Sequence, residues 1–260
     1  MKRDVAKKIP TARYLSRREM LGYISATVAA VLLGCERRQS DFANTTRVSP
    51  QAETKTGARV PPSCVVRPEQ TEGPYFVDER LNRSDIRSDP SDGLVKDGIP
   101  LKLALRVSQI SGNGCAPLAG AMVDLWQCDA LGIYSDVRDR SFDTSGKKFL
   151  RGYQVTDNNG SAEFITIYPG WYPGRTVHIH FKIRTDAASR RAYEFTSQLY
   201  FEETITDEVH LQAPYASRGR RTTLNTMDGI FRRGGDRLIL QVARQAQGYA
   251  GAFDIGLQIA

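Results

Sequence analysis

Residues 101–107, LKLALRV, carry the pattern that decides the fold. Leu101, Leu103, Leu105 and Val107 alternate with lysine, alanine and arginine, so an extended strand over this run would have one apolar face. A period of two is typical of a strand packed on a core, whereas an amphipathic helix repeats every three to four residues. This run therefore predicts a β-strand that is buried on one side.

The rest of the chain repeats this strand-like pattern at short intervals. Further candidate strands are AMVDLWQ (121–127), RLILQVA (237–243) and FDIGLQI (253–259). Turn signals lie between such runs, among them SGNG (111–114), DNNG (157–160) and YPGWYPG (168–174). Helical periodicity is confined to a turn or two within residues 204–214. Short strands with such turns favour a sandwich or a barrel, and we predict an all-β fold, a β-sandwich of mixed topology with long active-site loops.

The basic charge of the chain is concentrated at its start. The whole chain has 36 basic and 29 acidic residues, and residues 1–35 hold seven and two of these. The remainder has 29 against 27, a net charge of +2, which gives no electrostatic reason to expect nucleic acid as a partner. Within the first segment, Arg17 and Arg18 precede an apolar run from Leu21 to Leu33. That run is short for a membrane span and suits the core of an export signal.

The paired arginines resemble a twin-arginine export signal, and LLGC before residue 36 resembles a lipobox in which Cys35 would be lipidated. The alternatives are a chance arginine pair in an ordinary signal, and cleavage without a lipid. We expect residues 1–35 to be an export signal and residues 36–63 to be a flexible tether. Residues 64–260 would form one domain in the periplasm or cell envelope, with membrane contact only through an N-terminal lipid.

Three cysteines remain in that domain, and their spacing leaves the pairing open. In an oxidising compartment two of them would pair and one would stay free, but the sequence does not choose among Cys64, Cys115 and Cys128. The segments PLAGAMVDLWQ (117–127) and TDNNGSAEF (156–164) resemble small β-sandwich modules of the transthyretin and carboxypeptidase-regulatory kind. A lipid-anchored binding module without catalysis is therefore one alternative function.

The candidate site begins with two histidines in VHIHFKI (177–183). On a strand, side chains alternate between the faces, so His178 and His180 would point the same way and could converge on one metal ion. The opposite face is apolar and would join the core through Ile179, Phe181 and Ile183. Two imidazoles above a clean apolar face indicate a metal site.

The residues near these histidines favour a hard metal ion. Zinc would need a third histidine, a cysteine or a carboxylate, and a ferrous oxygenase site would need a carboxylate. The neighbourhood offers Tyr168, Tyr172 and Arg175 instead, and a phenolate oxygen suits a ferric ion. For Tyr168 we expect simple packing with its hydroxyl in water. A zinc hydrolase remains a second alternative.

Four segments in order resemble the intradiol ring-cleavage dioxygenases, which act on catechol and protocatechuate. They are EQTEGPYF (69–76), VDLWQCDALGIYSD (123–136), LRGYQVTDNNGSAEFITIYPGWYPGRTVHIHFKI (150–183) and TSQLYF (196–201). The resemblance implies a non-haem Fe(III) enzyme that inserts both atoms of O2 into a catechol-type diol and gives a cis,cis-muconate-type diacid. It leaves the ring substituents of the catechol open. The short loop before the histidines resembles a secreted subgroup, and we expect a homodimer.

The same resemblance implies roles for individual residues. The metal ligands would be Tyr134, Tyr172, His178 and His180. Arg175 would lie beside the substrate and stabilise its developing charge, and Gln198 would orient substrate or hydroxide. Tyr172 would also leave the metal and accept a proton from the catechol.

For several other residues near these motifs, the sequence leaves two possible roles open. Trp126 and Trp171 would line the site or pack in the core. Asp129 and Asp136 would support Tyr134 or cap its loop. His210, in TDEVHLQAPY, would be a surface or structural residue, because it stands in no partner pattern.

Overall fold

The computed structural model describes residues 65–112, 114–185 and 193–259. The predicted export signal and tether, including Cys35, lie outside these residues, and so does Cys64. Among the helices described in these ranges, none is both long enough and apolar enough to cross a membrane.

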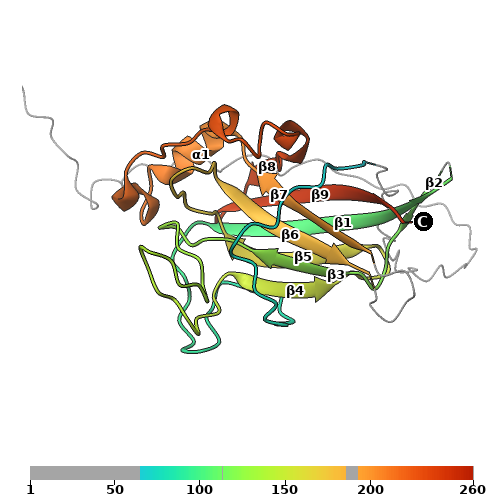
Figure 1. Cartoon of the computed structure of the whole chain (residues 1–260), viewed down its shortest axis with the longest axis horizontal. Coiled ribbons are helices and arrows are strands. Elements are labelled where there is room, and N and C mark those ends of the chain that lie inside the picture. The colour runs from blue at the N-terminus through green and yellow to red at the C-terminus, as the bar shows by residue number, and fades with distance from the viewer. Residues whose placement is uncertain (1–64, 113, 186–192, 260) are drawn as a thin grey trace, which may run out of the picture. The chain divides into compact units, whose positions relative to one another are not determined.

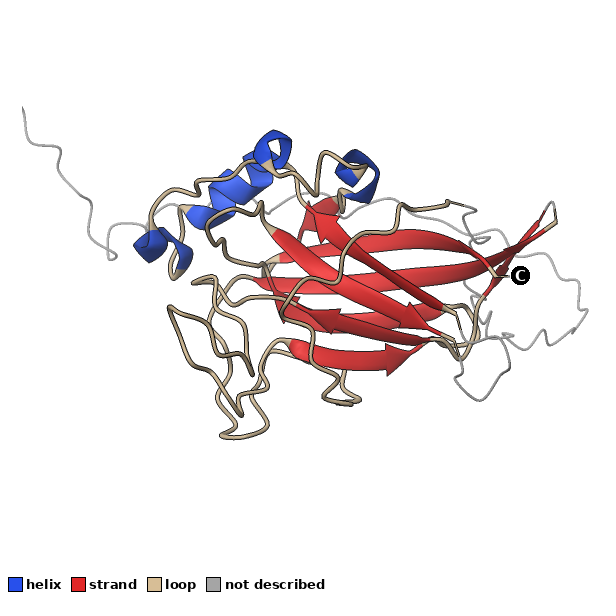
Figure 2. Ribbon diagram, viewed as in Figure 1, coloured by secondary structure: helices blue, strands red, loops and turns tan. Residues whose placement is uncertain are grey.

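The described residues form a β-sandwich of two sheets, as predicted (Figures 1 and 2). In the first sheet the order is β2-β1-β9-β8, and β5 also pairs with β1. Its strands are β1 (Pro100–Ser111), β2 (Gly114–Pro117), β5 (Ser161–Ile167), β8 (Val242–Arg244) and β9 (Tyr249–Gln258). The second sheet has the order β4-β3-β6-β7. Its strands are β3 (Met122–Trp126), β4 (Arg151–Val155), β6 (His178–Arg184) and β7 (Glu194–Tyr200).

The topology is mixed because β1 and β9 run parallel while the other pairs are antiparallel. The predicted period of two is confirmed in β1, where alternate residues are buried. Leu101 and Leu105 are 0% exposed, and from the other sheet Ile179 and Phe181 are also 0% exposed. The two sheets therefore enclose one core, in which shortening such a side chain to alanine would cost about 2–5 kcal/mol.

Helical structure is sparse and lies after β7. Within the described ranges the one α-helix is α1 (Glu203–His210), which confirms the helical turns predicted within residues 204–214. Short 3₁₀ helices follow at η1 (Tyr215–Arg218), η2 (Asn225–Met227) and η3 (Gly235–Leu238). These elements and the long loops gather at the end of the sandwich where β6 begins (Figure 1).

The predicted strand over residues 237–243 is wrong for most of its length. Its start is a 3₁₀ turn, and only Val242–Arg244 pairs as a strand. Gly234 precedes that turn with a φ of 94°, a left-handed conformation that favours glycine. Leu238 and Leu240 are still 0% exposed, so this irregular segment contributes apolar side chains to the core.

Tyr168 differs from the sequence-based expectation, whereas His210 has one of the two roles expected for it. Tyr168 is 0% exposed, and its hydroxyl lies 2.8 Å from Thr206 Oγ1, so the hydroxyl is not in water. His210 is structural: its ring stacks on Tyr215, and its Nε2 donates to the Pro169 carbonyl over 3.1 Å. A buried polar group needs such a partner, and helix α1 carries both Thr206 and His210.

The cysteines are also assigned in part. Cys115 is in a disulfide, and Cys128 is a free thiol that is buried in the loop after β3, the loop that carries Tyr134. Burial raises the pKa of Cys128 far above its usual range, so this thiol stays protonated.

Candidate metal centre

His178 and His180 stand at the beginning of β6 on the face opposite the core. Both imidazoles are nevertheless only 2% exposed, because loops and the chain before β1 cover this face. Their Nε2 atoms lie 3.0 Å apart. The two ring nitrogens therefore point at one place, as the sequence predicts for side chains at alternate positions of a strand.

The hydrogen bonds of His178 fix its tautomer. Its Nδ1 lies 2.6 Å from the carbonyl oxygen of Thr176, which can only accept, so Nδ1 carries the proton and Nε2 presents a lone pair. Burial, followed by the nearby Arg175, lowers the pKa of His178 to about 3. Burial also lowers the pKa of His180 well below its usual value. Both imidazoles are neutral, which is the form that binds a metal ion.

Tyr134 comes to the site from the loop after β3. The Asp129 carboxylate shapes this loop by accepting the backbone N–H groups of Leu131 and Ile133 over 2.9 and 3.0 Å. Asp129 therefore caps this loop, which is one of the two roles that the sequence suggested for it. The Tyr134 ring is 1% exposed, and its Oη lies 3.5 Å from His178 Nε2. Burial raises its pKa well above the usual value, so the phenol ionises only where a cation compensates the charge.

Tyr172 comes from the loop between β5 and β6. Its neighbour Trp171 anchors this loop, because the indole N–H donates to the Gly219 carbonyl over 3.2 Å. Trp171 belongs to the main core rather than to the site. Gly132 of the facing loop comes so close that an added Cβ would lie 2.2 Å from the Trp171 carbonyl oxygen. Tyr172 is half-buried, and its Oη lies 3.2 Å from His178 Nε2.

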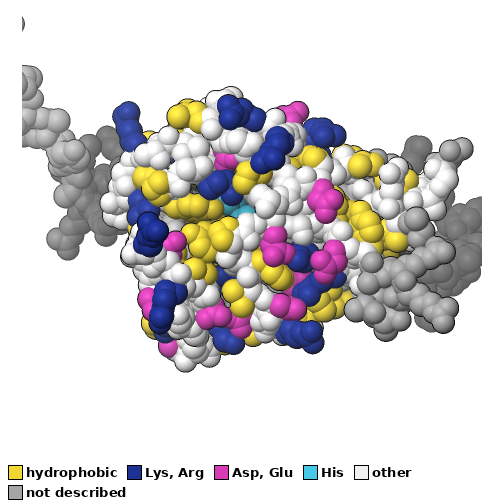
Figure 3. Space-filling view, viewed as in Figure 1, with side chains coloured by type: hydrophobic (Ala, Val, Ile, Leu, Met, Phe, Trp, Pro, Cys, Tyr) yellow, Lys and Arg dark blue, Asp and Glu magenta, His cyan; other side chains and the backbone are white. Residues whose placement is uncertain are grey.

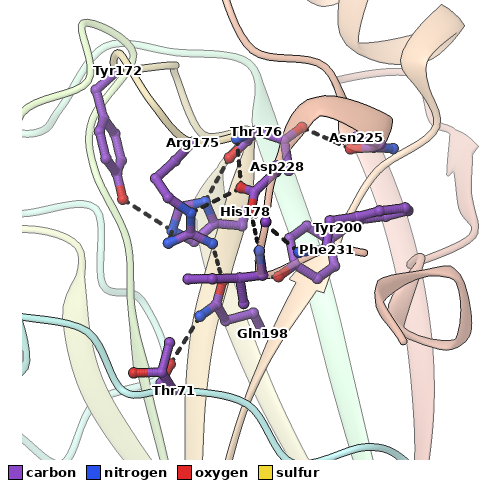
Figure 4. A network of polar contacts seen from close by, with 12 residues as sticks. Thr71, Tyr172, Arg175, Thr176, His178, Gln198, Tyr200, Asn225, Asp228 and Phe231 are labelled. Atoms are coloured by element: carbon purple, nitrogen blue, oxygen red, sulfur yellow. Dashed lines mark hydrogen bonds and ion pairs between the residues drawn. The ribbon is translucent and has the colours of Figure 1, made fainter. Parts of the chain in front are cut away.

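Arg175 and Gln198 meet at the same place (Figure 4). Arg175 Nη1 lies 3.4 Å from His178 Nε2, and its Nη2 donates to Gln198 Oε1 over 2.5 Å. The same Gln198 oxygen accepts the Tyr200 hydroxyl over 3.1 Å, and Gln198 Nε2 donates to the Thr71 carbonyl over 2.9 Å. The amide of Gln198 is therefore engaged with protein groups and orients Arg175.

All six predicted site residues thus lie together, and an aromatic cluster surrounds them. Trp126, Cys128 and Tyr134 form a buried group apart from the main core, flanked by Tyr75, Phe76, Val137 and Tyr172. Tyr75 stacks on Tyr134 with ring centroids 4.6 Å apart, and its hydroxyl donates to Asp139 over 3.1 Å. Trp126 therefore lines the site. Asp136 accepts the Gly146 N–H over 2.7 Å and caps the loop.

Sequence reasoning assigned no role to Tyr75, Tyr200 or Asp228. Tyr75 and Tyr200 stand inside the quoted segments 69–76 and 196–201, and Tyr200 is two positions after Gln198 on the same strand face. This spacing was a usable signal. Asp228, which pairs with Arg175 over 2.8 Å, stands in a segment without any such pattern.

In Figure 3 a histidine is visible on the face that is shown, with hydrophobic side chains beside and below it and a Lys or Arg side chain just above it. Across residues 65–112, 114–185 and 193–259, no three His, Cys, Asp or Glu side chains group together in a way that could hold a metal ion. The donors that converge on the two imidazoles are the phenols of Tyr134 and Tyr172.

These donors fit a ferric ion. The lone pair of His178 Nε2 faces the Nε2 of His180 and two phenol oxygens, all within 3.5 Å of it. Two neutral imidazoles and two oxygens that become anionic on binding form a set suited to a hard, highly charged metal.

Comparison with known proteins identifies the family. The dioxygenase family model matches residues 71–229. The chain is 30% identical over 167 residues to the protocatechuate 3,4-dioxygenase beta chain of Burkholderia cepacia, covering 60% of this chain and 69% of that protein. It is 27% identical over 154 residues to catechol 1,2-dioxygenase 1 of Acinetobacter lwoffii, covering 49% of this chain and 45% of that protein.

A solved structure agrees with these matches. An intradiol ring-cleavage dioxygenase from Tetranychus urticae aligns with 33% sequence identity and a TM-score of 0.63, covering 75% of this chain and 95% of that chain. The segment matched by the family model, residues 71–229, contains strands β3, β6 and β7 of the second sheet and all six predicted site residues. The chain therefore belongs to the intradiol ring-cleavage dioxygenases.

Proposed function

We propose that the protein is a non-haem Fe(III) enzyme that inserts both atoms of O2 into a catechol-type diol and releases a cis,cis-muconate-type diacid. The observation that carries this proposal is the approach of Tyr134 Oη and Tyr172 Oη to His178 Nε2, over 3.5 and 3.2 Å. With His180 they make a set of two phenols and two imidazoles, which supports ferric iron as the metal. Bound there, the iron would supply a Lewis-acidic centre at which a catecholate can react with O2.

The burial of the two tyrosines suggests different roles. Tyr134 is 1% exposed and is packed under Tyr75, so it would remain a ligand of the metal throughout. Tyr172 is more exposed than Tyr134, so it would be the tyrosine that leaves the metal when a catechol enters. Tyr172 Oη would then take up one of the two catechol protons. His178 and His180 hold their positions because both are buried on a strand.

Arg175 supplies positive charge next to the reacting ring. Its guanidinium lies 3.4 Å from His178 Nε2 and stays protonated, since Tyr172 and Asp228 outweigh burial and raise its pKa. A fixed cation in a site from which water is largely excluded stabilises negative charge that develops on the substrate. Gln198 orients this cation through the Nη2 contact.

The test is ring cleavage under labelled oxygen. The purified protein, loaded with ferric iron, is supplied with a panel of catechols under ¹⁸O2, and the products are analysed by mass spectrometry. The proposal predicts a diacid that contains two ¹⁸O atoms. Catechol binding without oxygen uptake would support the binding module instead, and ester or amide hydrolysis with zinc would support a hydrolase.

We propose, from the sequence alone, that the enzyme works outside the cytoplasm. The arginine pair before the apolar run and the LLGC motif at Cys35 support export and lipid attachment. The homodimer likewise stays a prediction. Membrane fractionation of the full chain beside a Cys35→Ser variant tests the anchor, because a lipid-anchored protein would move to the soluble fraction on this substitution.

A further inference from the structure

We propose that Asp228 is a positioning residue, which holds the Arg175 guanidinium in the orientation that the reaction requires. The inference rests on the proposed function and extends it to a residue 30 positions beyond the last predicted site residue, Gln198. It is carried by the polar network around Arg175 that Figure 4 shows.

The contact between the two side chains is direct and buried. Arg175 Nε donates to Asp228 Oδ2 over 2.8 Å, and the two side chains are 16% and 1% exposed. The same Asp228 oxygen accepts the backbone N–H of Thr176 over 2.9 Å. A charge-assisted hydrogen bond in a buried place is short and directional, so it restrains the guanidinium plane as well as neutralising its charge.

Asp228 is itself held in place. Its other oxygen, Oδ1, accepts the backbone N–H groups of Ile230 and Phe231 over 2.7 and 3.1 Å. The Phe231 ring meets Tyr200 edge-on with centroids 4.9 Å apart, which packs this turn against the strand that carries Gln198. Burial alone would raise the pKa of Asp228, but the Thr176 N–H and Arg175 outweigh it and lower that pKa. The carboxylate is thus ionised and has no free rotation.

The orientation of Arg175 follows from this restraint. With Nε fixed on Asp228, the two terminal nitrogens face the site: Nη1 lies 3.4 Å from His178 Nε2, and Nη2 donates to Gln198. Without the carboxylate, the guanidinium would keep only the contacts at its outer nitrogens. It could then rotate about its last side-chain bonds. A shift of about 1 Å in a catalytic group can reduce the rate on the order of 100-fold.

The decisive experiment is a double-mutant cycle. Asp228→Asn keeps an oxygen for the Ile230 and Phe231 N–H groups but removes the charge that holds Arg175. It is made in the natural chain and in an Arg175→Met chain, each loaded with ferric iron. In the natural background we expect kcat/KM for catechol to fall roughly 10- to 100-fold, mainly in kcat, with iron content and the resting visible spectrum unchanged. In the Arg175→Met background the same substitution should change kcat/KM less than about twofold.

A matched control separates positioning from simple destabilisation. Asp124 pairs with Arg184 over 2.7 Å and is 7% exposed, so Asp124→Asn also removes a buried aspartate–arginine pair. We expect it to lower the urea unfolding midpoint while leaving kcat/KM unchanged. Equal losses of kcat/KM from Asp228→Asn in both backgrounds would overturn the proposal. Loss of iron from the Asp228→Asn variant would also overturn it. Asp228 would then act on iron binding, through Thr176 and His178, and not on the orientation of Arg175.

A further readout does not depend on turnover. The natural chain, the Asp228→Asn and Arg175→Met variants and the double variant are each unfolded in urea. If the shifts in the unfolding midpoint caused by the two single substitutions do not add up to the shift of the double variant, Asp228 and Arg175 are coupled. If the natural chain cleaves no catechol, the proposed function fails, while this coupling still decides whether Asp228 holds Arg175. Additive midpoint shifts would contradict the inference in either case.

Discussion

The indole of Trp126 lies flat against the imidazole of His180, with ring centroids 4.9 Å apart and an angle of 8° between the planes. The two residues are paired in register across β3 and β6. His180 Nδ1 is buried and has no hydrogen-bond partner among the described residues. A metal-binding histidine is commonly oriented by a hydrogen bond from its second ring nitrogen. Here the stacked indole has that orienting role.

Replacing Trp126 should therefore weaken metal binding. We expect Trp126→Leu to lower iron affinity on the order of 10-fold, because His180 loses its flat support, while Trp126→Phe keeps most of it. Iron retained per chain in competition with a chelator is the measurement. The control is Phe195→Leu. Phe195 is a buried residue of the main core, on a strand but away from the site. Equal iron loss in the control would assign the effect to general destabilisation.

The two tyrosines should differ from a third buried tyrosine in the visible spectrum. Tyr134→Phe and Tyr172→Phe each remove one phenolate, so each should shift or weaken the charge-transfer band of the ferric protein. Tyr168→Phe is the control, since Tyr168 is 0% exposed and bonds to Thr206 instead. A spectrum that is unaltered by one of the first two substitutions would remove that tyrosine from the metal site.

Lys182 should hold the segment before β1 over the site. Its ammonium pairs with Glu72 and lies 4.3 Å from the centroid of the Phe76 ring, with 9% of the side chain exposed. We expect Lys182→Met to cost about 1–2 kcal/mol of local stability and to speed amide exchange in residues 69–76 roughly tenfold. The measurement is hydrogen exchange by mass spectrometry. Arg244→Met, which breaks an exposed pair with Glu208, should leave that peptide unchanged.

Cys128 should be inert in the folded protein. Its thiol is buried and its pKa is raised by burial, so thiolate is scarce and reagents cannot reach it. Alkylation with iodoacetamide, followed by mass spectrometry of the peptide that contains Cys128, should show labelling only at denaturant concentrations that unfold the chain. Fast labelling in native buffer would mean that the Tyr134 loop opens on its own.

The fold was predictable because its main signal is local. Alternation in LKLALRV and VHIHFKI places Leu103 and Phe181 on core faces without any knowledge of the partner strand. The failure over residues 237–243 has an equally local cause. The apolar run does not reveal the 3₁₀ turn Gly235–Leu238 at its start, and an irregular segment can bury Leu238 and Leu240 as completely as a strand does.

The site was predictable only as far as its motifs reach. His178 and His180 are neighbours on one strand, and Tyr134 and Tyr172 stand in segments with family-specific spacing. Asp228 meets Arg175 across 53 residues, and only tertiary packing brings them together. Tyr168 shows the same limit, because its hydroxyl partner Thr206 comes from helix α1.

The central claim is that Tyr134, Tyr172, His178 and His180 hold a ferric ion that binds a catechol. The most direct measurement is the visible absorption spectrum of the purified iron-loaded protein, before and after catechol is added without oxygen. The account predicts a broad phenolate-to-iron band that moves to longer wavelength when catechol binds. A protein that stays colourless after reconstitution with ferric iron would contradict it.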